Sequence, residues 1–247
     1  MRAEHEPTTP ATTEPKPHLR FDGVALTRGE RRVFDGFSLT LTEPRIGLIG
    51  NNGSGKSTLL RLAGGLLMPD AGTVQVHGLD TREHRRDLPR HIGFLFQNPD
   101  HQILFPTVEE EISFGMTENG LPTKEAKRQA AALLAEHGCA GWEGRATHAL
   151  SEGQKQLVCL LAVLSGGPSI LLLDEPFSSL DLPTRLDLRR RLRALPQRVV
   201  MVTHDFDLLR DFDRLIWLEA GRVRMDGAPD GVLPAYFDSV GYAGPGT

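Results

Sequence analysis

The chain of 247 residues has few cysteines and no long apolar run, and both absences limit what it does. Cys139 and Cys159 stand in apolar, helical surroundings without metal-type spacing, which favours two reduced, buried thiols in a cytosolic protein. No apolar run approaches the roughly 18 to 20 residues that a membrane helix needs. Residues 1–18 lack a signal-type apolar core, and their Pro, Thr and Glu predict a disordered N-terminal arm. Any membrane role is therefore expected to be peripheral.

An excess of basic charge is also missing. The net charge is −4 and the isoelectric point is about 6.1, so nothing indicates nucleic acid as a bulk partner. The run Arg189-Arg190-Arg191 falls in a helical pattern, where a solvated helix face is the better interpretation. We expect no nucleic-acid partner.

Short runs rich in leucine or β-branched residues alternate with helical patterns along the chain. The predicted strands are 19–26, 33–41, 45–49, 74–77, 92–96, 169–173 and 199–203, with a closing hairpin over 214–218 and 222–225. The predicted helices are 59–67, 107–114, 124–137, one from near 151 and one after 204. The pattern predicts an α/β fold in which a mostly parallel core, with an antiparallel β part, carries a helical insertion at about 98–167. We expect one domain over 19–236 and a flexible tail over 237–247.

A phosphate-binding motif follows the third predicted strand. Residues 50–57 match G-x-x-x-x-G-K-[ST] between a strand and a helix, which is the context that the motif requires. Glycines let successive backbone N–H groups converge on phosphates, and the helix N-terminus adds partial positive charge. Lysine at the seventh position would reach the β and γ phosphates, and the next hydroxyl would bind Mg²⁺. The residues predicted to hold ATP here are Asn51, Asn52, Gly53, Ser54, Gly55, Lys56, Ser57 and Thr58. A glycine-rich turn without function is the alternative, which the Lys-Ser pair makes a poor one.

Two carboxylates end a buried strand further along the chain. Residues 170–173 are apolar, and Asp174 and Glu175 follow at the carboxyl end, where open parallel sheets place their ligands. Asp174 is suited to hold a Mg²⁺ shell, and Glu175 to polarise an attacking water. Alone this pattern is a weak signal, but downstream of a phosphate loop it is a strong one.

Five further motifs accompany the phosphate loop, in order. They are Gln97, Leu150-Ser151-Glu152-Gly153-Gln154, Asp174-Glu175-Pro176, Ser179-Leu180-Asp181 and Val202-Thr203-His204-Asp205. Together they resemble the Q-loop, signature, Walker B, D-loop and switch histidine of ABC (ATP-binding cassette) ATPases, over about residues 19–235. The resemblance implies ATP hydrolysis, with Asp174, Ser57 and Gln97 around Mg²⁺. It implies Glu175 as general base and His204 on the γ-phosphate, where a surface histidine is the alternative.

The resemblance also implies that two such domains close head to tail. Each ATP would then lie between one subunit's phosphate loop and Ser151, Gly153 and Gln154 of the other subunit. The residues agree, since Ser151 and Gly153 stand at a predicted helix N-terminus with no phosphate of their own in reach.

Two positions depart from the family pattern. Glu152 replaces the first glycine of the signature, and because a carboxylate repels phosphate we infer that it points away while Gly153 keeps the close backbone approach. Arg28 occupies the place of the usual adenine-stacking aromatic residue. A guanidinium can also stack on a base, so Arg28 is a candidate adenine contact, or otherwise a solvated turn residue.

Residues 96–115 resemble the Q-loop region of energy-coupling-factor (ECF) transporter ATPases, which drive uptake of vitamins and of cobalt or nickel ions. In that family the neighbouring groove receives a coupling helix from a membrane subunit, so we expect docking near residues 98–106. Apolar Ile103, Leu104 and Phe105 suit such a dock. The alternative is that they pack inside the helical insertion, and Asn98, Pro99 and Asp100 are equally explained as a turn.

The expected function is ATP-driven micronutrient import from the cytoplasmic face of the cell membrane. The partners are a second ATPase subunit, a transmembrane coupling subunit and, indirectly, a substrate-binding membrane subunit. A homodimer is favoured over a heterodimer because one chain carries every motif. Cobalt or nickel is preferred as substrate, with biotin or another vitamin next. The alternatives are a soluble ABC ATPase acting on ribosomes, DNA or division machinery, and a non-hydrolysing regulatory cassette.

Overall fold

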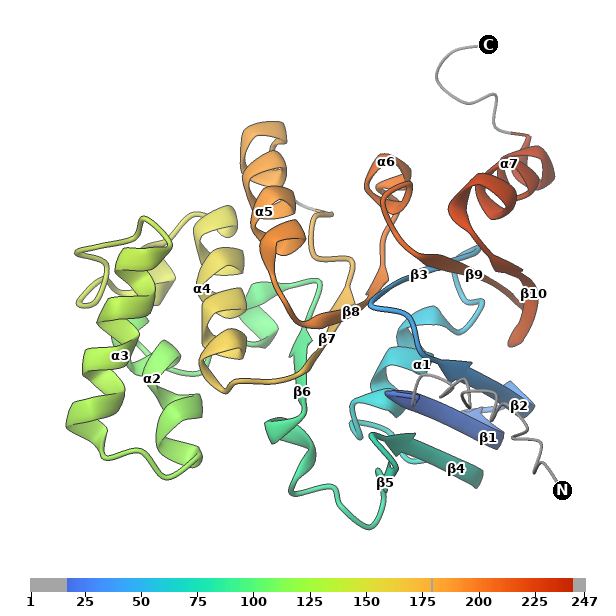
Figure 1. Cartoon of the computed structure of the whole chain (residues 1–247), viewed down its shortest axis with the longest axis horizontal. Coiled ribbons are helices and arrows are strands. Elements are labelled where there is room, and N and C mark those ends of the chain that lie inside the picture. The colour runs from blue at the N-terminus through green and yellow to red at the C-terminus, as the bar shows by residue number, and fades with distance from the viewer. Residues whose placement is uncertain (1–16, 179, 242–247) are drawn as a thin grey trace, which may run out of the picture.

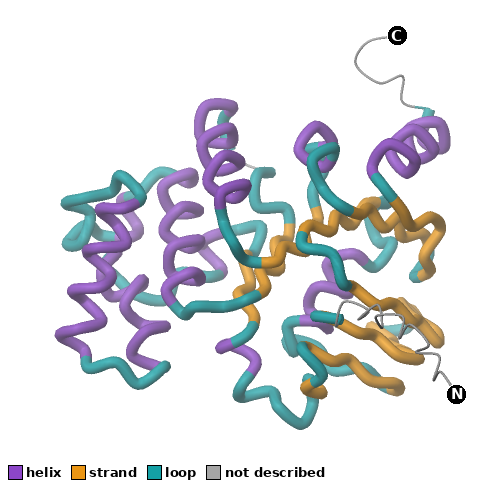
Figure 2. The backbone as a smooth tube through the Cα atoms, in the orientation of Figure 1, coloured by secondary structure: helices purple, strands orange, loops and turns teal. Residues whose placement is uncertain are grey.

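The computed structural model describes residues 17–178 and 180–241. A six-stranded sheet lies at its centre, with a four-stranded sheet and α1 on one face and α5, α6 and α7 on the other (Figure 1). The helices α2, α3 and α4 gather at one end of the molecule (Figure 2). These layers confirm the predicted α/β class.

The strands and helices have the following bounds. The strands are β1 Leu19–Arg28, β2 Arg31–Leu41, β3 Arg45–Ile49, β4 Ala71–Val76, β5 Leu79–Asp80, β6 Ile92–Leu95, β7 Ile170–Asp174, β8 Arg198–Val202, β9 Arg214–Glu219 and β10 Arg222–Gly227. The α-helices are α1 Lys56–Ala63, α2 Val108–Glu118, α3 Thr123–Glu136, α4 Glu152–Ser165, α5 Leu182–Ala194, α6 Phe206–Leu209 and α7 Pro229–Val240. Short 3₁₀ turns are η1 Leu88–Arg90, η2 Pro99–His101 and η3 Thr147–Ala149.

The order of the six-stranded sheet brings distant motifs together. Its strands run β10-β9-β3-β8-β7-β6, and β3, β8, β7, β6 and β9 pair in parallel. In register, Val202 of β8 pairs with Leu48 of β3 on one side and with Asp174 of β7 on the other. Because parallel strands end at the same sheet edge, the segments after Ile49, Asp174 and Val202 emerge side by side.

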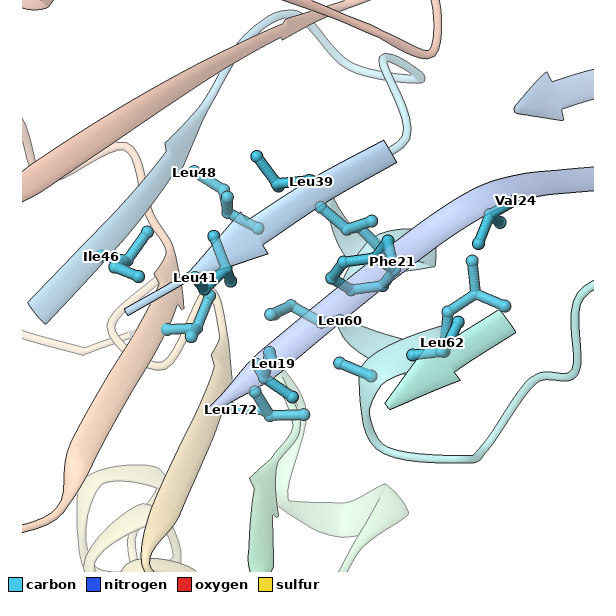
Figure 3. Close-up of a cluster of buried hydrophobic side chains, with 14 of the residues drawn as sticks. Leu19, Phe21, Val24, Leu39, Leu41, Ile46, Leu48, Leu60, Leu62 and Leu172 are labelled. Carbon is cyan, nitrogen blue, oxygen red and sulfur yellow. The ribbon is translucent and has the colours of Figure 1, made fainter. Parts of the chain in front are cut away.

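Each central strand is buried on both faces, as parallel sheets require. In β7, Ile170 and Leu172 belong to the core under β1, β2 and α1, part of which is shown in Figure 3. Leu171 and Leu173 face the opposite core with α5, α6 and α7. Full burial of such side chains contributes about 1.5 to 3 kcal/mol each, which explains why runs of leucine predict these strands well.

A third, smaller core lies among the helices of the insertion. It contains Val108 and Ile112 of α2, Ala130 and Leu134 of α3, and Val158 and Leu161 of α4. Cys159 and Leu160 of the same helix belong instead to the core between the six-stranded sheet and α5, α6 and α7, called the central core below. The helix that carries the signature residues is therefore shared between the insertion and the sheet.

Several predicted boundaries differ from the structure, among them that α2 runs to Glu118 and that β4 begins at Ala71. Helix α1 spans Lys56–Ala63 and not 59–67, because it begins at the phosphate loop itself and ends where Gly65 takes a φ of 65°. The expected tail begins too early, since α7 continues to Val240. His18, assigned to the N-terminal arm, is buried beside β1, while the rest of that arm over 1–16 lies outside the described residues.

Among residues 17–178 and 180–241, no helix combines the length and the apolar character needed to cross a membrane.

Candidate nucleotide site

The phosphate loop runs from β3 to α1 in a conformation that requires glycine. Gly50 has a φ of 136° and Gly55 a φ of 110°, values that L side chains rarely adopt. A Cβ on Gly55 would stand 2.9 Å from Cζ of Phe34, and one on Gly50 would overlap the carbonyl oxygen of Leu218. The loop therefore lies tightly on β2 and β9.

Lys56 is buried within the curve of this loop. Its Nζ donates to the carbonyl oxygens of Gly50, at 2.6 Å, and Asn51, at 3.1 Å. Burial lowers the pKa of Lys56, and the nearby carboxylates of Glu175 and Asp174 oppose that change. The lysine is thus held against the first two residues of the loop.

Ser57 and Asp174 meet across the end of the sheet. The Ser57 hydroxyl donates to Oδ1 of Asp174 at 2.7 Å, and the carboxylate is only 5% exposed. Arg61 Nη2 lies 3.9 Å from Oδ2 of the same carboxylate. A serine hydroxyl beside an aspartate offers the hard oxygen donors that Mg²⁺ prefers, so this pair fits a magnesium site.

Glu175 and His204 form a second pair at the same edge. Oε1 of Glu175 lies 3.3 Å from Nε2 of His204, and the Glu175 backbone N–H donates to Val202 O at 2.9 Å. Glu175 takes a φ of 51°, an uncommon conformation that turns its side chain off the line of β7. Burial raises the pKa of Glu175, while His204 pulls it down. A carboxyl with a raised pKa at a strand end is suited to proton transfer.

These groups line one cleft of about 630 Å³. Its lining includes many of the predicted site residues, namely Arg28, Asn52, Gly53, Gly55, Lys56, Ser57, Thr58, Gln97, Glu175 and His204. Asp174 lies behind Ser57, Ser54 is buried under the loop, and Asn51 is exposed. Gln97 donates from Nε2 to the Ser178 hydroxyl at 3.3 Å, which ties the predicted Q-loop to the segment after Glu175.

Sequence reasoning missed three polar residues of the cleft. Arg31, Arg61 and Ser178 all line it. Arg31 donates from Nη2 to the Gly53 carbonyl at 2.7 Å, so it covers the phosphate loop from β2. Arg61 could have been found from its spacing, because it lies one helical turn after Ser57. Nothing local in the sequence of β2 indicates that Arg31 faces the loop.

The signature residues lie outside this cleft. Ser151 caps α4, its Oγ accepting from the Gln154 N–H at 3.3 Å while Gln154 Oε1 accepts from the Ser151 N–H at 3.1 Å. Glu152 is exposed in the first turn. The structure brings Ser151, Gly153 and Gln154 together at a helix N-terminus, but not to the phosphate loop of their own chain.

A strand, a glycine loop and a helix surround a buried lysine, and a carboxylate ends the parallel strand next but one in the sheet. This arrangement defines a P-loop nucleotide-binding protein. The sequence comparison narrows this class, because the family described as ABC transporter matches residues 34–178. The chain belongs to the ABC transporter family and is one of its ATPases.

Several curated relatives are similar over most of their length. The biotin transport ATP-binding protein BioM of Rhodobacter capsulatus is 49% identical over 86% of this chain and 91% of its own. The cobalt import ATP-binding protein CbiO of Syntrophus aciditrophicus is 38% identical over 83% and 75%. The energy-coupling factor transporter ATP-binding protein EcfA1 of Symbiobacterium thermophilum is 38% identical over 86% and 80%. The predicted resemblance to ECF-type ATPases is confirmed.

Solved structures agree in fold. CbiO1 of Clostridium perfringens, part of the ABC transporter complex CbiONQ, superposes with a TM-score of 0.77 at 27% identity, covering 90% of this chain and 92% of that one. An ATP-binding cassette solved as a dimer in a post-hydrolysis state with ADP and Pi gives a TM-score of 0.73 at 27% identity, covering 86% and 99%.

Proposed function

We propose that this chain is the ATP-hydrolysing subunit of an ECF-type importer and works as a head-to-tail dimer at the cytoplasmic face of the membrane. One observation carries the proposal. The cleft gathers a phosphate loop, the Ser57–Asp174 pair and the Glu175–His204 pair, whereas the capped signature turn lies outside it. Half of an ATP site is therefore present, together with the complementary half for a partner.

Within the cleft, each group has a role that its position suits. Lys56 and the loop amides would bind the β and γ phosphates, and Ser57, Asp174 and Gln97 would hold Mg²⁺. When bound, Mg²⁺ supplies charge neutralisation at the phosphates. Glu175 would accept the proton of the attacking water, and His204 would orient Glu175 and contact the γ-phosphate. Arg28 and Arg31, on the same wall of the cleft, would contact the base or the phosphates.

The dimer supplies what the single chain lacks. Ser151, Gly153 and Gln154 present backbone N–H groups and a partial positive charge at the start of α4, which suits the γ-phosphate bound by the other subunit. The solved relative that is a dimer with ADP and Pi supports this arrangement. Since one chain carries both halves, we propose a homodimer, and pairing with a paralogue is the alternative.

An apolar patch next to the predicted Q-loop supports a membrane partner. Leu104 is 73% exposed, and the Phe105 ring packs on the partly exposed Phe114 with ring centroids 4.9 Å apart. The buried carboxylate of Glu111 accepts from both the Leu104 and Phe105 N–H groups at 2.9 Å, which fixes this loop with Leu104 outward. Ile103 packs on the central core instead, so it belongs to the fold more than to the patch. A rigid, exposed apolar patch of this kind fits a coupling helix from a transmembrane subunit.

For the transported substrate, we propose biotin ahead of cobalt or nickel, which reverses the preference drawn from the sequence. The relative with biotin in its name is 49% identical, and the relative with cobalt in its name is 38% identical. Binding of the substrate itself would belong to a membrane subunit, so the ATPase would act on it only indirectly.

Substitution of Leu104 by Asp tests the docking step. The change places a charge in the centre of the apolar patch without altering the cleft, so the membrane subunit should no longer co-purify while the ATPase rate of the isolated chain stays within about twofold. Met225→Asp is the matched control, because Met225 is a partly exposed apolar residue on β10 at 36% exposure. Co-purification of the Leu104→Asp chain at the level of the control would contradict docking at this patch.

A separate experiment decides the substrate. The uptake of labelled biotin and the uptake of labelled cobalt by the reconstituted complex are compared.

A further inference from the structure

The second residue of α4, Gly153, packs directly against Thr184 in the first turn of α5. A Cβ on Gly153 would overlap the Cγ2 methyl of Thr184 and stand 3.3 Å from its Cβ and 3.4 Å from its Oγ1. Side chains on both helices would not fit at this distance. A contact inside the chain therefore already requires glycine at this position, whether or not a phosphate is present.

Thr184 is itself held in place by the start of α5. Asp181 caps this helix and accepts from the Thr184 backbone N–H at 3.0 Å. Hydrogen bonds from the Thr184 side chain and backbone lower the pKa of Asp181. The Cγ2 methyl of Thr184 thus lies on Gly153, while the backbone N–H of Thr184 donates to the capping residue Asp181.

The signature turn is also fixed from its other side. The reciprocal cap between Ser151 and Gln154 sets its backbone, and Lys155 donates to Oδ1 of Asp100 in η2 at 2.6 Å. The turn is therefore held between the Q-loop region and α5. In the proposed dimer, the signature turn faces the partner's nucleotide, so its contact with α5 ties that half-site to the central domain.

We propose, resting on the dimer proposed above, that Thr184 is a positioning residue that locks the signature turn to the start of α5. The signature turn then reaches the partner's ATP as one rigid unit with the start of α5. On this account the space that Thr184 occupies, by itself, excludes a side chain at position 153. Thr184 does not line the cleft of its own chain, and it acts through Gly153.

A double-mutant cycle tests whether glycine is needed at position 153 for the contact with Thr184 or for the approach to the phosphate. Gly153→Ala is made in the native background and in a Thr184→Ser background, which removes the Cγ2 methyl and keeps the hydroxyl that bonds to Asp181. All chains carry Glu175→Gln to slow hydrolysis, and ATP-driven dimer formation is measured by analytical ultracentrifugation. ATP affinity of the single chain is measured beside it, since Gly153 does not line its own cleft.

We expect Gly153→Ala to weaken ATP-driven dimerisation about tenfold in the native background and less than about threefold in the Thr184→Ser background. ATP affinity of the single chain should not change. A loss of the same size in both backgrounds would overturn the proposal, because the glycine would then serve the phosphate. No loss in the native background would overturn it too.

Two further measurements distinguish a failure of this proposal from a failure of the proposed dimer. A Thr184→Ala background serves as a second test if serine rotates into the same space. If the chain with Gly153 and Thr184 intact fails to dimerise with ATP, the proposed dimer fails. The Gly153–Thr184 contact is then still decided by urea unfolding of the single chains, where Gly153→Ala must destabilise the native background more than the Thr184→Ser background.

Discussion

Among single residues, Glu175 is the one on whose protonation state the proposed hydrolysis depends most. Burial raises the pKa of its carboxyl, and His204 lowers it. Its backbone takes a φ of 51°, and its Oε1 lies 3.3 Å from Nε2 of His204. In its proposed role as general base the carboxyl must be deprotonated, yet burial favours the protonated form. Such opposed influences are common where a carboxyl has to exchange a proton during turnover.

Glu175→Gln should therefore abolish steady-state hydrolysis while leaving ATP binding intact. The amide keeps the size of the side chain but cannot accept a proton, so we expect kcat to fall by at least about a hundredfold. In the unaltered chain, the acid limb of the kcat profile should lie above pH 4.5, the ordinary value for glutamate, because burial raises the pKa. Retained turnover in the Gln variant would contradict the assignment and favour a different base.

His18 gives the protein a pH-dependent stability. Burial, with Arg198 and His77 nearby, lowers the pKa of His18 from 6.5 to about 4. Between these values the unfolded chain binds a proton that the folded chain refuses, so stability falls as the pH drops from about 6.5 toward 4. We expect the free energy of unfolding to lose about 1 to 2 kcal/mol from this group between pH 7 and pH 5.

Urea unfolding at the two pH values checks this expectation. His18→Gln should remove that part of the loss, whereas His148→Gln, at an exposed position, should not. Equal pH dependence in the two variants would show that His18 is not the source.

Some residues of the cleft were predictable from the sequence, and others were not. Lys56, Ser57 and Asp174 were identifiable because motif spacing fixes them relative to a strand and a helix. Arg31 was not, because its contact with Gly53 depends on how β2 lies over the loop. The contact between Gly153 and Thr184 was hidden for the same reason, since it joins two helices that are far apart in sequence.

At the scale of elements, the N-cap in the first turn of helix α4 is expected to contribute to the stability of the fold. Ser151→Ala removes the side-chain acceptor of the N-cap, which typically costs about 1 kcal/mol of folding free energy. Urea unfolding without nucleotide measures this cost. Ser239→Ala is the control, since that hydroxyl donates to the Tyr236 carbonyl near the end of α7 and caps no helix start. Equal stability of the two variants would mean that the cap contributes nothing.

The elements that were predicted well are the buried parallel strands, because short runs of leucine and valine bounded by turn residues are typical of strands covered on both faces. Strand β3 at Arg45–Ile49 matches its prediction at both ends. Helix α7 was missed because Pro229, Gly231 and Pro234 weaken the helical pattern. Pro229 is tolerated at the first turn, and Val232, Leu233 and Phe237 are buried against the sheet, so packing outweighs local preference.

For the whole molecule, the arrangement of motifs matters more than any one of them. The sheet edge collects the phosphate loop, Asp174, Glu175 and His204, while α4 holds the signature turn away from this cleft. The proposed docking patch at Leu104 follows η2, and η2 is tied to the same helix because Lys155 of α4 donates to Asp100 in η2. In the proposed transporter, this contact would link movement at the docking patch to movement of the signature turn.

The central claim is that each ATP site is built from two chains, and mixing two inactive variants tests it most directly. Lys56→Ala disables the phosphate loop, and Ser151→Asp keeps a good helix cap while placing a negative charge at the signature turn. Each variant alone should hydrolyse no ATP. Mixed in equal amounts, random pairing gives hybrid dimers with one intact site, so about a quarter of native ATPase activity should return. A mixture that stays as inactive as its two components would contradict a site shared between chains.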